Sequence, residues 1–153
     1  MSVVGQTAVD IRLELYVLDP SLIVGDEPGP FSIGDRIWLR LLDTRRYDRD
    51  RGPHVMSLGL ELGPDPSPRI VAEALWDFLR PRRGGRGIVT ARVMRRREER
   101  RIEAAGTSIV DRHELWFAIP LRSNRGARRQ IDAFFDEVLG PAPLGPASEL
   151  SSG

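Results

Sequence analysis

The stretch DRHE, at positions 111–114, holds the ionisable residues best spaced for catalysis: Asp111, His113 and Glu114. A histidine beside a carboxylate can move protons as a general acid or base. In a strand, residues two apart point to the same face, so Asp111 and His113 could share a site. The one other histidine, His54, lies far away in the sequence, and metal centres usually need three protein ligands. We expect no metal and no cofactor, and we interpret DRHE first as the polar entry to a strand.

Arginine is concentrated at positions 92–101. A local excess of this kind could neutralise phosphates, and binding to nucleic acid would then weaken steeply with salt. The same residues could meet an acidic protein surface, although a solvated surface is the interpretation that we favour. The arginines are Arg92, Arg95, Arg96, Arg97, Arg100 and Arg101, with Glu98 and Glu99 among them.

A second charged stretch, DTRRYDRDRG, covers positions 43–52. Its acidic and basic residues alternate, so it largely neutralises itself, and it is typical of a solvated loop. Arg45, Arg46 and Tyr47 could nevertheless bind an oligonucleotide through charge and base stacking.

Composition limits the remaining functions. All 23 basic residues are arginine, the formal net charge is +1 and there is no cysteine. The arginine bias indicates a GC-rich genome, and the near-neutral charge argues against a dedicated duplex-binding domain. The absence of cysteine excludes thiolate chemistry and disulfides. There is no secretory signal or apolar run of about 20 residues, so we expect a cytoplasmic protein.

No motif for a nucleotide, flavin or catalytic serine is present. The stretch RRGGRG, at 82–87, has glycines like those of a phosphate-binding loop. A strand, and not a helix, is expected to follow it, so these glycines indicate a turn.

Apolar residues that alternate with polar ones predict five strands. In the first, Val9, Ile11, Leu13, Leu15 and Val17 share one face. In the other strands, Trp38 and Trp116 fall opposite the inward aliphatic residues. If a second layer covers that face they are core residues, which is the interpretation that we favour, and if the face is open they are exposed aromatics of an interface. The predicted strands cover 8–18, 37–42, 54–63, 87–94 and 107–121.

Two amphipathic helices are predicted from apolar residues that recur every three or four positions. The first begins after Ser67 and ends before Pro81. The second is capped by Ser123 or Asn124 and ends at Gly140-Pro141. Positions 95–105 fit either a helix with pairs four apart or the arm of a hairpin with Glu98-Glu99 near its tip.

The element order predicts an α+β fold: a five-stranded, mostly antiparallel sheet or a small OB-like barrel, with an added C-terminal helix. The stretches PGPFSIGDRIWLRLL and GRGIVTARV resemble parts of small-barrel proteins from GC-rich actinobacteria, which implies a barrel and no particular activity. We expect one globular domain over 1–140 and a flexible tail rich in proline, glycine and serine over 141–153.

The function that these features favour is a non-enzymatic interaction or regulatory module that binds another macromolecule, most readily a protein. The first alternative is an OB-like nucleic-acid binder that uses the arginine-rich patch. The second is a small enzyme with the Asp111, His113 and Glu114 site. Membrane binding is not expected, and the sequence leaves the oligomeric state open.

Overall fold

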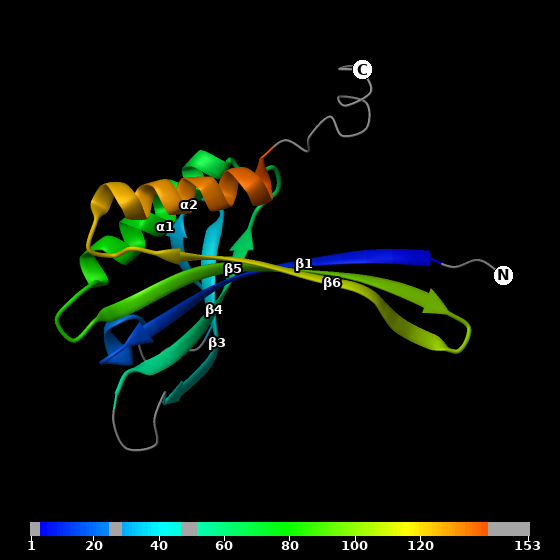
Figure 1. Ribbon diagram of the computed structural model, residues 1–153, viewed down its shortest axis with the longest axis horizontal. Coiled ribbons are helices and arrows are strands. Elements are labelled where there is room, and N and C mark those ends of the chain that lie inside the picture. The colour runs from blue at the N-terminus through cyan, green and yellow to red at the C-terminus, as the bar shows by residue number, and fades with distance from the viewer. Residues whose placement is uncertain (1–3, 25–28, 47–51, 141–153) are drawn as a thin grey trace.

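A computed structural model describes residues 4–24, 29–46 and 52–140, and for the strand residues 4–9, 99–103 and 107–112 it describes the backbone alone. The described chain forms one six-stranded antiparallel sheet in the order β2-β3-β4-β1-β5-β6. Two α-helices lie on one face of this sheet (Figure 1). The strands are β1 (Val4–Val17), β2 (Phe31–Gly34), β3 (Ile37–Arg46), β4 (His54–Leu62), β5 (Ile88–Glu103) and β6 (Gly106–Ile119).

The alternating residues of β1 separate the two faces of the sheet, as their spacing predicts. Ile11, Leu13, Leu15 and Val17 are buried on the helix side. The register continues this apolar layer into the neighbouring strands, because Leu15 lies opposite Met56 of β4 and Ala91 of β5. The core therefore lies between the central strands and the helices.

Both helices begin where the sequence predicts. In α1 (Pro68–Leu79), the Ser67 side chain accepts a hydrogen bond from the Ile70 amide, and Pro68 occupies the first turn. In α2 (Asn124–Leu139), the cap is Ser123, which accepts from Gly126. Each helix turns one apolar stripe toward the sheet and leaves its polar side in solvent.

Two of the connections contain a 3-10 turn. A 3-10 turn, η1 (Pro20–Leu22), follows β1, and a second, η2 (Arg80–Arg82), follows α1. The sequence RRGGRG then forms the turn into β5, in which Gly84 and Gly85 have φ angles of 77° and 56°. Positive φ favours glycine at both positions.

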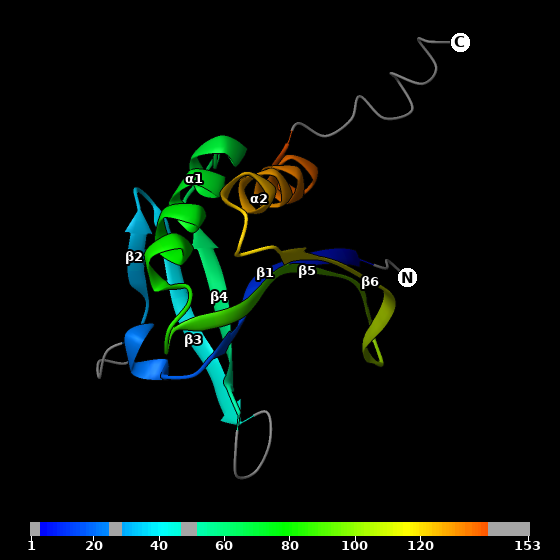
Figure 2. The same cartoon turned by 60° about the vertical axis from the view of Figure 1, so that its left-hand side comes forward.

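Positions 95–105 belong to a hairpin arm and not to a helix. Strands β5 and β6 stay paired from Ala91 opposite Ile119 to Glu103 opposite Gly106. The sequence interpretation placed the tip of the arm near Glu98-Glu99. The pairing shows that the tip lies further along the chain, between Glu103 and Gly106. Figure 1 and Figure 2 show that this arm and the first half of β1 extend beyond both helices.

Two features of the predicted architecture are wrong. The sheet has six strands and not five, because Phe31–Gly34 adds a short edge strand, β2, beside β3. The described sheet is also open, since β2 and β6 stand at opposite ends of the strand order, and no closed barrel is formed. The predicted tail, 141–153, lies outside the described residues.

Candidate interaction surface on the uncovered face of the sheet

The face of the sheet opposite the helices is not covered by any described element (Figure 2). We call it the uncovered face. Strand periodicity brings to it every second residue of the central strands. Its described members on β1 and β5 include Asp10, Arg12, Glu14, Tyr16, Arg92, Met94, Arg96 and Glu98.

Trp116 is the most exposed large aromatic side chain of this face. It is 55% exposed and lies across from Met94 of β5. The next residue, Phe117, points the other way and packs against Phe134 of α2. Trp116 is therefore held on the solvent side by the alternation of its own strand.

Arg92 links the aromatic residues of the uncovered face. Its guanidinium lies 5.4 Å from the ring centroid of Tyr16 and 5.5 Å from that of Trp116. It also donates a hydrogen bond of 3.1 Å to the Tyr16 hydroxyl, and its Nε is 3.4 Å from a Glu14 carboxylate oxygen. These contacts fix the two rings on either side of one cation.

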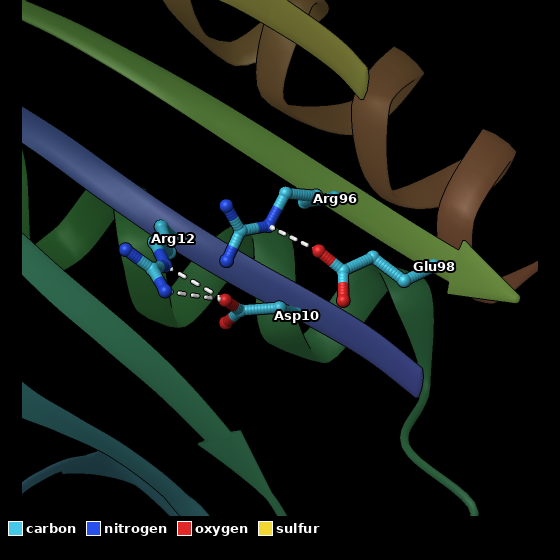
Figure 3. A network of polar contacts seen from close by, with 4 residues as sticks. All are labelled: Asp10, Arg12, Arg96 and Glu98. Atoms are coloured by element: carbon cyan, nitrogen blue, oxygen red, sulfur yellow. Dashed lines mark hydrogen bonds and ion pairs between the residues drawn. The ribbon is translucent and has the colours of Figure 1, made fainter. Parts of the chain in front are cut away.

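A row of ion pairs continues from this cluster toward the arm. The Arg12 Nε and Nη2 each lie 2.7 Å from Asp10 Oδ2. On β5, Arg96 Nε lies 3.7 Å from Glu98, whose side chain is only 7% exposed. Figure 3 shows both pairs in front of β1 and β5, with the helices passing behind them.

The β3 end of the uncovered face also places an ion pair beside an aromatic side chain. Arg40 forms an ion pair with Glu61 of β4 at 2.5 Å, and the half-buried Trp38 lies opposite Glu61. Leu42 covers Gly59, where an added Cβ would stand 3.4 Å from Leu42 Cδ1. That distance is an ordinary van der Waals contact, so Leu42 packs on Gly59 without requiring a glycine there.

Both tryptophans differ from the sequence expectation that they are core residues under a second layer. Trp116 is exposed, and Trp38 is half-buried outside the helix-side core. The reason is that both helices lie on the same face. The alternation of the sequence places these residues opposite the aliphatic stripe. It does not predict whether a second layer covers them.

The strand geometry divides the predicted arginine patch. Arg92 and Arg96 lie on the uncovered face, whereas Arg95 and Arg97 alternate onto the helix side. Arg95 is half-buried, and its Nε has no hydrogen-bond partner among the residues that the structure describes. Arg100 and Arg101 belong to β5 opposite Gln6 and Gly5 of β1, and their side chains lie outside the described residues.

The second predicted binding stretch is partly a strand. Arg45 and Arg46 form the exposed end of β3, and Arg45 lies 3.4 Å from Asp43. Tyr47 lies outside the described residues. The strand thus runs further than the predicted 37–42, and Arg45 has a local acidic partner.

The strand also separates the members of the predicted catalytic cluster. His113 lies opposite Arg97 and Glu114 opposite Arg96, so these two residues belong to opposite faces of β6. Asp111 shares the parity of His113, opposite Glu99, but its side chain lies outside the described residues. His113 and Glu114 are both exposed. The described part of the chain holds no group of three His, Asp or Glu residues suited to a metal ion.

The glycine turn borders a hollow of about 500 Å³. Its arginine is already engaged, because Arg83 donates a 2.7 Å hydrogen bond to the Leu121 carbonyl and lies over the Trp76 ring. The Gly84 amide donates to Ile88. These contacts support the interpretation of RRGGRG as a turn.

Tyr16 is the aromatic residue of the Arg92 cluster that sequence reasoning did not single out. The sequence feature that could have indicated Tyr16 is its place with Asp10, Arg12 and Glu14 on the polar side of β1. Only the pairing of β1 with β5 brings it to Arg92, 76 residues away.

A comparison with known proteins found no family model that matches this chain, and no match among curated proteins or solved structures. In the described part of the chain, no helix is long and apolar enough to cross a membrane.

Proposed function

We propose that this protein is a non-enzymatic interaction module that binds another protein through the uncovered face of its sheet. The observation that carries the proposal is the exposed Trp116 held beside Arg92 and Tyr16 on a face that no described element covers. Tryptophan, tyrosine and arginine are the residues most enriched among those that dominate the energy of protein interfaces.

The charges of this face favour a protein over a nucleic acid. The described arginines of the face, Arg12, Arg40, Arg45, Arg92 and Arg96, each form an ion pair with a carboxylate. A phosphate backbone would have to displace these carboxylates, whereas a protein partner can bury the aromatic centre and leave a paired polar rim in solvent.

The direct test compares two alanine variants in an affinity capture from nuclease-treated lysate of the source cells. Trp116→Ala removes the exposed ring, and Ile70→Ala removes another exposed hydrophobic side chain, 56% exposed on α1. We expect Trp116→Ala to weaken capture of the same protein about fivefold or more, and Ile70→Ala to leave it unchanged. Equal capture by both variants would contradict the proposal.

Nucleic acid is the second candidate, and the exposed Trp116 ring on an antiparallel sheet is what favours it. In many RNA-binding domains, bases stack on rings of this kind. Single-stranded oligonucleotide on a column separates the candidates. Retention at low salt that is lost with Trp116→Ala would favour nucleic acid, and no retention would favour the protein partner.

A further inference from the structure

The outer edge of β6 is the longest free strand edge in the described part of the chain. Strand β6 pairs with β5 on one side and has no described strand on the other. From Asp111 to Ile119 its pairing runs without a register shift. The opposite edge is formed by β2, which has only four residues, and by the part of β3 beyond Leu39, where the pairing with β2 ends. A short edge strand protects a sheet against the addition of a strand from another molecule, and β6 is too long to be protected in this way.

One carboxylate beside this edge forms no ion pair with another residue that the structure describes. Glu114 lies opposite Arg96, but Arg96 is directed to Glu98. The other described carboxylates of the uncovered face are each paired with an arginine, namely Asp10, Glu14, Asp43, Glu61 and Glu98. Glu114 is therefore available to a cation from outside.

Trp116 lies next to Glu114 on the same face, because the two residues are two apart in β6. An indole ring attracts a guanidinium or ammonium group over its face, and a carboxylate beside it pairs with the same group. The side chains of a strand added to β6 would lie about 5 Å from these two residues. The free edge and the two side chains thus present their groups to one extended segment.

The geometry points to β6 as a site of strand addition for an extended partner segment that carries a basic residue. The partner's backbone pairs with the edge from Asp111 to Ile119, and its arginine or lysine lies over Trp116 and pairs with Glu114. This inference rests on the proposed function and names the partner's chemistry: main-chain hydrogen bonds provide the affinity, and the cation provides the specificity.

The test uses synthetic peptides of about ten residues, the length of a long strand. In one, arginine alternates with threonine, and in its counterpart glutamate replaces arginine. Binding to the full chain is measured by fluorescence anisotropy of the labelled peptide. We expect the arginine peptide to bind more tightly, Glu114→Gln to weaken it about two- to fivefold, and Trp116→Ala about fivefold or more. The exposed, distant Glu73→Gln of α1 is the matched control and should bind like the wild type.

Alternate N-methylation of the arginine peptide tests the backbone contact. Methyl groups on one set of alternate amides block the edge that faces β6, and those on the other set face solvent. We expect one methylated peptide to lose binding and the other to keep it. Equal binding of the two methylated peptides would overturn the inference, and so would equal binding of the arginine and glutamate peptides.

Two further outcomes bear on the same inference. A wild-type chain that is dimeric, with β6 amides protected from hydrogen exchange before peptide is added, would overturn it, because a second copy then fills the edge. Capture of a protein that depends on Trp116 but is unchanged by Glu114→Gln and by excess arginine peptide would also overturn it. That last result would leave the proposed function standing.

Discussion

Trp116 and Phe117 are neighbours in β6, yet they lie on opposite faces of the sheet. The Phe117 ring meets Phe134 edge to face, with centroids 5.6 Å apart, whereas Trp116 is 55% exposed. We expect Phe134→Ala to lower the free energy of unfolding by about 3–5 kcal/mol, because it leaves a cavity in the core. Trp116→Ala should cost less than about 1 kcal/mol. Urea unfolding of both variants checks this difference.

This comparison also separates binding from stability. Trp116→Ala should keep the cooperative unfolding of the wild type while it loses the partner. If Trp116→Ala unfolds as easily as Phe134→Ala, the ring is a core residue and the uncovered face is not a binding surface.

The ion pair between Arg92 and Glu14 should be worth little by itself. It is 3.4 Å long, and the two side chains are 37% and 24% exposed. A double-mutant cycle with Arg92→Met and Glu14→Gln should give a coupling free energy of about 0.5 kcal/mol, which decreases in high salt. A coupling above about 2 kcal/mol that salt does not change would contradict this reading, since only a desolvated pair behaves so.

Consecutive arginines of the arm should respond in opposite ways to substitution by methionine. Arg95 has a buried Nε without a hydrogen-bond partner, so Arg95→Met should keep the free energy of unfolding or raise it by up to about 1 kcal/mol. Arg96 is paired with the buried Glu98, so Arg96→Met should lower it by about 1 kcal/mol or more. Urea unfolding of the two variants side by side is the measurement, and a larger loss for Arg95→Met would refute the assignment of the faces.

Asp19 should make unfolding depend on pH in the acid range. The Ser21 hydroxyl and the Ser21 amide both donate to its carboxylate, and these hydrogen bonds hold the pKa of Asp19 below its ordinary value of 3.8. A carboxyl whose pKa is lower in the folded state stabilises the fold above its unfolded pKa. That contribution is lost as the pH falls through the lowered pKa.

Ser21→Ala removes one of the two donors, so the pKa of Asp19 should rise toward its ordinary value. The carboxyl carbon shift of Asp19, followed by NMR during an acid titration, measures this directly. Ser32→Ala is the control, because the Ser32 hydroxyl donates to the Gly34 carbonyl and not to a carboxylate. An unchanged Asp19 titration in Ser21→Ala would show that the hydroxyl does not stabilise the charged form.

The strands and helices that carry long periodic patterns could be predicted from the sequence. The alternation of Ile11, Leu13 and Leu15 fixed the inner face of β1, and Ser67 with Pro68 marked the start of α1. Strand β2 was missed because its four residues are too few to show a period. The arm remained ambiguous because its charged residues fit two periods equally well.

The candidate surface depends on pairings that no local pattern contains. Tyr16 and Arg92 meet only when β1 and β5 pair, and Trp116 joins them from the next strand. Because both helices pack on the other face of the sheet, this cluster is left in solvent. Sequence reasoning could name the alternatives for Trp116, but tertiary packing chose between them.

The far half of the β5–β6 arm lies away from both helices (Figure 1), and the first half of β1, which pairs with it as far as Val4 opposite Ile102, joins it to the rest of the sheet. Adding or deleting one residue in each strand would move the tip by about 3.3 Å, and a pair in each would also keep every remaining side chain on its face. The hairpin can therefore vary its reach over evolution, or by design, while the helix-covered end stays the same.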